Sequence, residues 1–318
     1  MLNVLVVGAG QIGSRHLQGL ISVQLDLNII VVDISNFSLD SAKLRWGEAG
    51  GNQSHHKIYW CKKIPVDIKN IDLAIITTSS LGRAILVEQI ALSVNVNYWV
   101  FEKILAQSKQ ELDLIKYATS KAKNAWVNTP KRSMTWYQKL RIEFNNKGSL
   151  KIKKKGGLWG LACNSIHYID LVNWWTGESL FSVNTSKLDK IWHKSKRLGY
   201  FEVSGELLIE FSGGTKLILQ SYPNEVKNIM NIELYDKQNW IINEHEGVAY
   251  KSKKEILSGK VELQSEMTGP MVTKILIEGT SNLPNLKESS KQHAIFLDAM
   301  LSHWNTCNKF DDKVVPIT

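Results

Sequence analysis

One histidine lies in an otherwise apolar, helix-like stretch and is followed three residues later by a carboxylate. The stretch GLWGLACNSIHYIDLVNWWTG spans residues 157–177 and contains His167 and Asp170. An imidazole and a carboxylate one helical turn apart can hold and move a proton. The same spacing also suits a helix start with one polar edge. The stretch alone leaves both interpretations open, so a reason for proton chemistry has to come from the remaining chain.

Polar side chains also follow three apolar segments of the first half, each typical of a buried strand. They are Asp33 after residues 27–32, Thr77 and Thr78 after residues 71–76, and Glu102 with Lys103 after residues 97–101. Parallel strands present their carboxyl ends at one edge of a sheet, where ligands of doubly wound α/β proteins bind. We therefore expect these residues on one rim. Lys103 there could orient a substrate hydroxyl or share in proton transfer, although an isolated lysine is more often ordinary surface.

The first predicted strand and helix surround a glycine-rich turn. Gly8, Gly10 and Gly13 form G-x-G-x-x-G between an apolar run at residues 2–7 and a run of helix formers. The first glycine permits the tight turn, the second lets the backbone approach a pyrophosphate, and the third lets helix and strand pack closely. A helix N-terminus adds amide donors and partial positive charge. Gln11 and Ile12 therefore join the glycines as predicted cofactor contacts.

Asp33 indicates which coenzyme the turn would bind. It lies 20 residues after Gly13, where a carboxylate accepts hydrogen bonds from an adenosine ribose and repels a 2′-phosphate. We therefore predict NAD, with NADP disfavoured, and include Thr77, Thr78, Glu102 and Lys103 among the cofactor contacts. The alternative is a glycine turn and a strand-terminal aspartate that hold no ligand.

Two domains are expected from the length and from a change of pattern along the 318 residues. In the first part the strands already mentioned alternate with helices at 83–92 and 107–123, and a sixth strand is expected at 125–127. This alternation predicts a Rossmann domain, a doubly wound parallel sheet, over residues 1–125.

The second domain, residues 126–318, is expected to be α+β with a large, mostly antiparallel open sheet. Period-2 patterns predict two hairpins, one from residues 200–211 and 216–222 and one from residues 228–236 and 239–247. A helix is expected at 289–304 and can pack back near the first domain. Leu208, Ile218 and Trp240 are candidates for an apolar sheet face suited to self-association.

The combination of these motifs resembles the Gfo/Idh/MocA oxidoreductases, the family of glucose–fructose oxidoreductase and inositol dehydrogenase. The resemblance rests on VVGAGQIGSRH, on EK at Glu102-Lys103, on GG followed by a His-x-x-Asp helix, and on the closing PIT. It covers nearly the whole chain. It implies the two-domain fold described above, oligomerisation through the open sheet, and hydride transfer between NAD(P) and a sugar-like carbinol or carbonyl.

The resemblance also implies catalytic roles for Lys103 and His167 beside the nicotinamide. In the oxidative direction, His167 would take the hydroxyl proton while Lys103 bonds the same oxygen. Two positions depart from the family pattern. Ile104 replaces a proline that makes a cis bond accessible, and Cys163 replaces an aspartate that would make the histidine more basic. Predicted substrate contacts are Lys103, Arg132, Asn164, Ser165 and His167.

Most of the net charge of +9 comes from one segment. Residues 131–155 hold nine Lys or Arg and a single acidic residue, Glu143. This segment is compatible with a nucleic-acid footprint, a pocket for an anionic small molecule, or a solvated face. No recognition-helix pattern accompanies it, so no nucleic-acid partner is expected. Because Lys153 and Lys155 lead into the His167 helix, we favour a nucleotide-activated or acidic sugar of surface-polysaccharide synthesis as substrate.

Composition narrows the setting. No apolar run approaches the ~18 residues of a membrane span, so no membrane partner is expected. Three isolated cysteines, Cys61, Cys163 and Cys307, favour a reducing compartment and argue against a structural zinc site. We predict a cytoplasmic homodimer or homotetramer without a metal. The alternatives are a dehydrogenase of a free polyol or sugar, and a catalytically weak NAD-binding sensor or partner protein.

Overall fold

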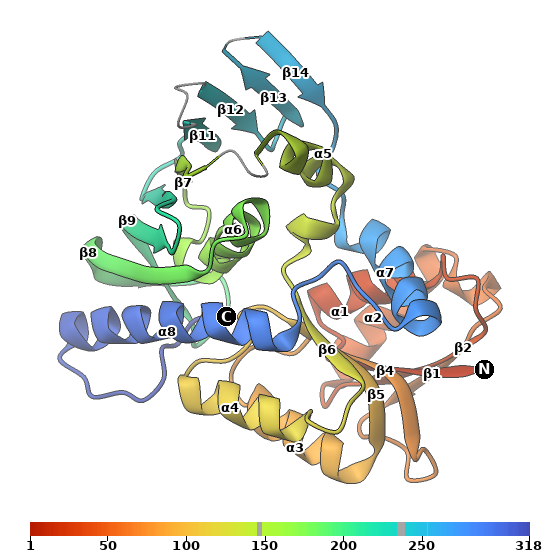
Figure 1. Cartoon of the computed structure of the whole chain (residues 1–318). Helices are drawn as coiled ribbons and strands as arrows, with labels where there is room; N and C mark the ends of the chain where they lie inside the picture. Colours follow the sequence, from red (N-terminus) through yellow and green to blue (C-terminus); the bar gives the residue numbers. More distant parts are fainter. Residues whose placement is uncertain (145–147, 234–238, 253) are drawn as a thin grey trace. The chain divides into compact units, whose positions relative to one another are not determined.

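The computed structural model describes residues 1–144, 148–233, 239–252 and 254–318 (Figure 1). These residues form two compact units. The first unit holds residues 1–105, 110–130 and 262–287, and the second holds residues 106–109, 131–261 and 288–318. The chain therefore returns to the first unit late in the sequence, a feature that the predicted division at residue 125 did not contain.

A six-stranded parallel sheet forms the centre of the first unit, with the order β3-β2-β1-β4-β5-β6. Its strands are β1 (Leu2–Val7), β2 (Leu27–Val32), β3 (Lys57–Cys61), β4 (Asn70–Ile76), β5 (Asn95–Glu102) and β6 (Asn124–Asn128). The doubly wound parallel sheet is therefore confirmed. Only β3 was not predicted, because this edge strand is half exposed and lacks a continuous apolar run.

Helices pack against this sheet, and those within residues 1–125 alternate with its strands as predicted. They are α1 (Gln11–Leu20), α2 (Asn36–Glu48), α3 (Arg83–Ser93), α4 (Lys109–Ala118) and α7 (Gln264–Glu278), with short 3₁₀ turns η1 (Gly51–Gln53) and η2 (Pro130–Ser133). The helix expected at 107–123 begins and ends within that range. Buried aliphatic side chains of β1, β2 and β4 form one core cluster with α1, α2 and α7.

Helix α7 belongs to the first unit because it packs very closely on α1. A β-carbon at Gly19 would lie 2.6 Å from the Cβ of Thr268, and one at Gly269 would lie 2.0 Å from the Ser22 hydroxyl. Val272 and Ile275 of α7 then reach the core of the sheet. Two glycines more than 240 residues apart in the sequence therefore permit this contact.

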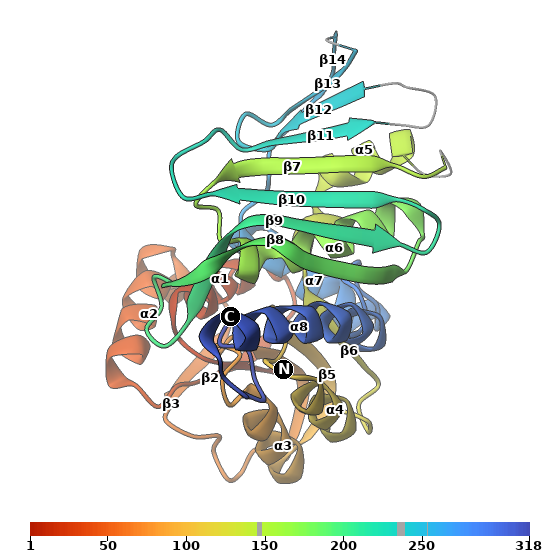
Figure 2. The same ribbon diagram turned by 90° about the vertical axis from the view of Figure 1, so that its left-hand side faces the viewer.

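The second unit contains an eight-stranded sheet with the order β14-β13-β12-β11-β7-β10-β9-β8 (Figure 2). Its strands are β7 (Lys151–Gly157), β8 (Leu180–Lys194), β9 (Phe201–Phe211), β10 (Lys216–Tyr222), β11 (Ile229–Glu233), β12 (Asn239–Asn243), β13 (Val248–Lys251) and β14 (Lys254–Ser258). Every pair is antiparallel except β7 with β10. The predicted mostly antiparallel sheet is confirmed.

Both predicted hairpins are present as strand pairs. Strand β9 pairs with β10, and β11 pairs with β12; the turn of the second hairpin falls on residues 234–238, outside the described residues. Strand β7 lies between β10 and β11, so it links the two hairpins into one sheet. Its place was not predicted, because pairing between segments far apart in sequence leaves no local signal.

Helices α5 (Thr135–Phe144) and α6 (Leu161–Thr176) cover one face of this sheet, here called the inner face (Figure 2). The prediction that Trp240 lies on an open face is wrong. Its indole is 1% exposed and packs edge-on against Phe144 of α5. Leu208 and Ile218 are only partly buried and pair in register on the outer face. Ile241, the neighbour of Trp240, also lies on that outer face.

The closing residues are part of the second unit. Phe201 of β9 donates its amide to the Pro316 carbonyl, and the Val315 amide donates to the Gln107 carbonyl. The Gln107 side chain donates in turn to the Ile317 carbonyl at 3.2 Å. Helix α8 (Leu286–Asn308), which includes the predicted helix 289–304, precedes this tail. Residues 106–109 therefore belong to the second unit through the tail.

Replacement of Gly19 by alanine tests the packing of α7 on α1. The new Cβ would lie 2.7 Å from the Ser265 carbonyl oxygen, a backbone atom that cannot turn away. We expect Gly19→Ala to lower the free energy of unfolding by about 1–3 kcal/mol, measured by urea denaturation followed by circular dichroism. Arg15→Ala, at an exposed position of the same helix, should change it by less than ~0.5 kcal/mol. Equal stability of the two variants would contradict the close approach.

Candidate active site

The glycine turn is shaped by two of its three glycines and opened by the other. Gly8 has a φ of +102°, which an L side chain rarely adopts. A β-carbon at Gly13 would lie 1.9 Å from the Gly8 carbonyl oxygen, so helix α1 can follow β1 this closely only with glycine there. A β-carbon at Gly10 would have no atom within 4 Å. The backbone at Gly10 is therefore accessible to a ligand.

The two strand ends on either side of β1 hold the turn in place. The Asp33 carboxylate accepts the Ala9 amide at 2.7 Å and the Ser35 amide at 2.8 Å. The Thr77 hydroxyl donates to the carbonyls of Val7 and Gly8 at 2.9 and 2.6 Å. Asp33 has further lone pairs for ligand hydroxyls. In contrast, Thr77 is engaged by the turn itself.

Thr78, the next residue, has a different environment. Its hydroxyl oxygen is buried and lacks a hydrogen-bond partner among the described residues. Buried polar atoms in native proteins nearly always have a partner. A ligand on this rim could supply one, so Thr78 fits the predicted role in cofactor binding.

Glu102 is enclosed in the interior of the first unit. Its carboxylate accepts from Asn128 Nδ2 at 2.5 Å and lies 3.0 Å from His16 Nε2. The other ring nitrogen of His16 lies 3.0 Å from the Thr268 hydroxyl. Burial alone would raise the pKa of Glu102, but the contacts with His16 and Asn128 outweigh it and hold the pKa below its usual value. Glu102 is therefore ionised and anchors the strand end that carries Lys103.

A buried arginine fixes the residues around Lys103, and the sequence analysis missed it. Arg83 is 1% exposed and donates to the carbonyls of Glu102 at 2.6 Å and Leu105 at 3.1 Å. It also donates to the carbonyls of Thr78 and Ile104. The Lys103–Ile104 peptide bond is cis, so the cis geometry occurs here without proline. Arg83 thereby connects the ends of β4 and β5 beside Lys103.

In the second unit, α6 begins on a carboxylate from another strand. Glu202 of β9 accepts the amides of Ala162 at 2.8 Å and Cys163 at 3.2 Å. These amides lie in the first helical turn, where they have no intrahelical acceptor. A negative charge at this end is also favoured by the helix dipole. The structure therefore places a carboxylate next to Cys163, although it comes from β9.

Three predicted site residues share the first two turns of α6 but differ in direction. The Ser165 hydroxyl is buried and donates to the Leu161 carbonyl at 2.5 Å. The Asn164 side chain donates to the Trp159 carbonyl at 2.7 Å and closes the turn before the helix. His167 is partly exposed and lies on the face of α6 that also carries Cys163. Of these three residues, Ser165 uses its hydroxyl for a hydrogen bond within the helix and is fully buried.

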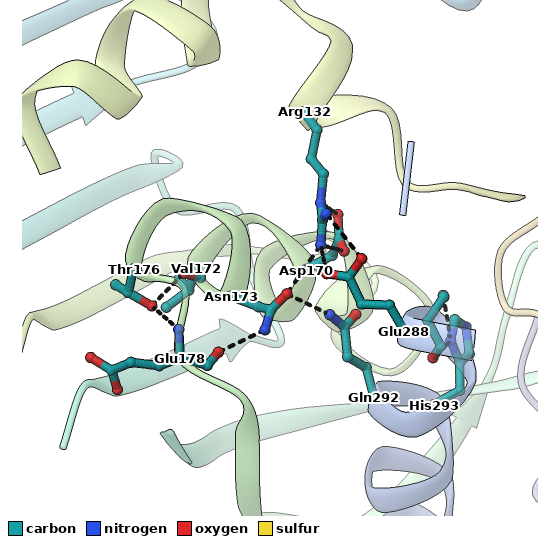
Figure 3. Close-up of polar contacts among 10 residues, drawn as sticks. Arg132, Asp170, Val172, Asn173, Thr176, Glu178, Glu288, Gln292 and His293 are labelled. Carbon is teal, nitrogen blue, oxygen red and sulfur yellow. Dashed lines mark hydrogen bonds and ion pairs between the residues drawn. The ribbon is translucent and has the colours of Figure 1, made fainter. Parts of the chain in front are cut away.

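Asp170, the carboxylate of the His-x-x-Asp sequence, forms an ion pair with Arg132 (Figure 3). The guanidinium of Arg132 donates to both Asp170 oxygens at 2.8 and 2.5 Å and to Glu288 of α8 at 2.6 Å. It also reaches the Asn173 side chain at 3.1 Å. Figure 3 shows this arginine, predicted to contact substrate, between two carboxylates. It joins η2, α6 and α8, which fixes the helix that carries His167.

A buried cluster of lysines, tyrosines and one glutamate lies beside α6, and the sequence analysis did not identify it. Lys131 donates to Glu244 Oε1 at 2.6 Å and to the Tyr137 hydroxyl at 2.9 Å. The hydroxyls of Tyr137 and Tyr168 also donate to Glu244, the latter at 2.7 Å. Tyr168 directly follows His167. This polar cluster therefore lies against the helix that carries the candidate base.

Lys154 of β7 points toward the same cluster. The lysines of this strand alternate between faces: Lys151 and Lys153 are exposed, whereas Lys154 is 3% exposed and shares the inner face with Ile152. The period-2 pattern around Ile152 could have indicated this orientation. Burial, and then the nearby Lys131 charge, lower the pKa of Lys154 to about 7.

No family model matches the chain, and no curated protein matches it. Solved structures do match. UDP-N-acetylglucosamine 3-dehydrogenase GnnA from Acidithiobacillus ferrooxidans is 13% identical, with a TM-score of 0.71, over 96% of this chain and 99% of that chain.

Two further structural matches were solved with ligands. Levoglucosan dehydrogenase, in complex with NADH and L-sorbose, is 14% identical, with a TM-score of 0.70, over 96% of this chain and 97% of that one. Myo-inositol dehydrogenase from Lactobacillus casei, in complex with NAD(H) and myo-inositol, is 13% identical, with a TM-score of 0.66, over 100% and 97%. The fold that the Gfo/Idh/MocA resemblance implied is therefore confirmed.

Across residues 1–144, 148–233, 239–252 and 254–318, no helix has the length and apolar character to cross a membrane. In the same ranges, no three His, Cys, Asp or Glu side chains lie together in a way that could hold a metal ion.

The glycine turn allows a matched pair of substitutions. Gly13→Ala should destabilise the protein by about 1–3 kcal/mol, because its Cβ overlaps the Gly8 carbonyl. Gly10→Ala should leave stability within ~0.5 kcal/mol, because its Cβ meets no atom and its φ of −69° is ordinary. Urea denaturation measures both. A similar loss of stability in the two variants would show that the turn is shaped differently.

Because its pKa is lowered in the folded protein, Lys154 should destabilise the protein more at pH 7 than at higher pH. Folding lowers the pKa of its amine from 10.5 to about 7. Between these pH values the unfolded chain therefore binds a proton that the folded chain lacks. The buried charged amine lowers the free energy of unfolding by its full amount below pH 7, and by less as the pH rises toward 10.5. We expect Lys154→Met to raise Tm at pH 7 by at least ~2–4 °C, the shift that corresponds to ~1 kcal/mol.

The pH dependence separates this effect from ordinary repacking. Calorimetric scans should show the gain of Lys154→Met shrinking between pH 7 and pH 9.5. Lys153→Met removes the same charge from the outer face of the same strand, where the side chain is 45% exposed, and should show no such trend. A gain that is the same at both pH values would mean that Lys154 is not titrating as described.

Proposed function

We propose that the protein is an NAD-dependent oxidoreductase that acts on the CH–OH or carbonyl group of a sugar-like substrate. The observation that carries this proposal is the glycine turn, which exposes backbone at Gly10 between the Asp33 carboxylate and the buried Thr78 hydroxyl. Two dehydrogenases of similar fold were solved with such ligands, one with NADH and L-sorbose and the other with NAD(H) and myo-inositol. These neighbours support the assignment of both cofactor and substrate class.

The proposed cofactor site uses the rim of the first sheet. Gly10 and the first amides of α1, those of Gln11 and Ile12, would bind the pyrophosphate. Asp33 would accept the ribose hydroxyls, and its charge favours NAD over NADP. Bound NAD would supply hydride transfer, which protein side chains cannot perform.

Lys103 and His167 are the proposed catalytic residues. His167 would take the hydroxyl proton during oxidation, and Lys103 would hydrogen-bond the same oxygen and stabilise its developing charge. Both are held by buried partners: Arg83 fixes the backbone around Lys103, and the Arg132–Asp170 pair fixes α6. Cys163 lies one turn before His167. We assign it a packing role.

The proposed substrate is a nucleotide-activated or acidic sugar, of the kind used for surface polysaccharides. Support comes from the fold of UDP-N-acetylglucosamine 3-dehydrogenase and from the basic segment. Only part of the basic segment can contribute to this binding. Lys153 and Lys155 lie on the outer face of β7, so attraction of an anion to the α6 side depends on Lys154. A free polyol is the alternative, supported by the likeness to myo-inositol dehydrogenase.

Self-association through the outer sheet face and a cytoplasmic location remain part of the proposal. Leu208, Ile218 and Ile241 supply apolar surface on that face, and Lys216–Glu210 supplies an ion pair at 3.2 Å. Such a mixture of apolar and paired polar groups suits a symmetric dimer. Cys61, Cys163 and Cys307 form no disulfide in the described part of the chain, as expected for a reducing compartment.

A second function is favoured by one observation. The carboxylate at the start of α6 comes from Glu202 and is occupied by two backbone amides. It is therefore less available to raise the basicity of His167. A protein that binds NAD and turns over no substrate would be a sensor or a partner subunit.

Cofactor binding and turnover test these functions. Calorimetry should show that NAD and NADH bind to the coenzyme-free protein. In absorbance assays of NADH with a panel of sugars, polyols and nucleotide sugars, His167→Ala should lower kcat by roughly 10²–10⁴-fold with NAD affinity unchanged. His193→Ala, on an exposed part of β8, is the control. Binding without turnover would favour the sensor, and no binding of either coenzyme would contradict both functions.

A further inference from the structure

Lys154 is a buried cation whose hydrogen-bond acceptor is neutral. Its amine donates to Asn228 Oδ1 at 3.0 Å and lies over the ring of Trp159 at 4.3 Å and that of Tyr168 at 5.2 Å. No carboxylate among the described residues forms an ion pair with it. Aromatic faces favour a cation but neutralise none of its charge. The folded chain therefore leaves this charge uncompensated.

The carboxylate in the surrounding cluster is already occupied by other donors. This carboxylate, Glu244, accepts from Lys131, Tyr137 and Tyr168. Two amines thus share a single counter-charge. Isolated buried charges are expensive, and a protein normally pairs them or neutralises them. Burial, and then the positive charge of Lys131, lower the pKa of Lys154.

An anion could bind Lys154 at the position that the Asn228 side-chain oxygen occupies. Asn228 lies on the partly exposed segment between β10 and β11, and its side chain reaches Lys154 only because Gly156 lacks a β-carbon, which would lie 1.8 Å from Oδ1. An oxyanion that displaced this amide oxygen would replace a neutral acceptor by a charged one. Trp159 is also partly exposed, and its indole is held by a hydrogen bond to the Gln220 carbonyl at 3.0 Å. Such a ring can stack on a sugar.

We propose that Lys154 is a specificity-determining residue that pairs with an oxyanion carried by the sugar substrate, a carboxylate or a phosphate, beside the aromatic rings of Trp159 and Tyr168. The proposal rests on the proposed function, which it deepens by naming the charge of the substrate. It also explains why a lysine that weakens the empty protein stands at this position, since substrate-binding groups often reduce stability.

Binding of the oxyanion should be coupled to proton uptake. At pH 7 an amine with a pKa of about 7 is protonated in about half of the molecules. Contact with an anion favours the protonated form. Complex formation should therefore take up about half a proton per ligand at pH 7 and less at pH 6. The other groups that face Lys154 are Lys131, Glu244 and Tyr168. Burial lowers the pKa of Lys131, but the neighbouring Glu244 outweighs burial and raises that pKa above its usual value, so Lys131 stays protonated in this range. Burial raises the pKa of the Tyr168 hydroxyl, which therefore stays neutral.

The experiment is calorimetry on the full chain saturated with NAD. The ligands are D-glucose, D-glucuronate and D-glucose 1-phosphate, with the matching galactose series, each measured at pH 7 in two buffers of different ionisation enthalpy. The wild type should bind one class of anionic sugar about 10- to 100-fold more tightly than the neutral sugar. Which class is preferred identifies the oxyanion as a carboxylate or a phosphate.

Three variants isolate the role of Lys154. Lys154→Met should lose both the anion preference and the proton uptake. Lys154→Arg should keep the preference without proton uptake, because a guanidinium stays charged at pH 7. Lys153→Met, which removes one charge from the opposite face of β7, should behave as wild type. Lys154→Met is expected to remain folded, since it removes a buried charge, and thermal unfolding verifies this.

The outcomes separate this inference from the function on which it rests. Equal affinity for neutral and anionic sugars in the wild type, or an anion preference that persists in Lys154→Met, would overturn the role of Lys154 while NAD binding and turnover could still stand. Failure of the protein to bind NAD in the preceding titration would instead overturn the proposed function itself.

Discussion

Charge buried with defined partners is the constraint on which both units depend. In the second unit, Asp170 is fully buried and is matched by the guanidinium of Arg132, which also holds Glu288. Removal of either member would leave an unpaired charge in the interior, which typically costs about 3–5 kcal/mol. The pair therefore ties α6 to η2 and α8. This anchoring fixes the position of the helix that carries His167.

The first unit uses the same principle around Lys103. Glu102 is ionised in the interior because His16 and Asn128 contact its carboxylate. Arg83 contributes a buried cation whose donors are spread over backbone carbonyls of the β4 and β5 ends. The residues next to Lys103 are thus held from both sides. Such a fixed backbone position is what the proposed catalytic role of Lys103 requires.

Lys154 differs from these groups because no carboxylate in the described part of the chain forms an ion pair with it. The contrast is informative because the neighbouring Lys131 is fully matched by Glu244 at 2.6 Å. Two amines in one buried polar cluster therefore have different charge states near neutral pH. Lys154 requires a counter-ion or deprotonation, and under the proposed function an anionic substrate is the source of the counter-ion. Of the basic segment that stood out in the sequence, this proposal uses one lysine.

The two departures from the family pattern have separate structural accounts. At Ile104 the peptide bond to Lys103 has the cis geometry without proline, and the Arg83 guanidinium contacts the carbonyls around it. At Cys163 the helix start is occupied by Glu202 from β9. A local sequence pattern could show that the aspartate was absent. It could not show that another strand brings a carboxylate to the same turn.

The sequence by itself determined the parallel sheet, the glycine turn, and the strand-end positions of Asp33, Thr78 and Lys103. These follow from patterns within about 30 residues, where apolar runs and glycines specify strand, turn and helix directly. Only the tertiary structure decided that Arg132 pairs with Asp170, that α7 returns to the first unit, and that Lys154 faces inward beside Lys131. Each of these depends on groups distant in the chain, and on which face of a strand or helix becomes buried once distant segments pack together.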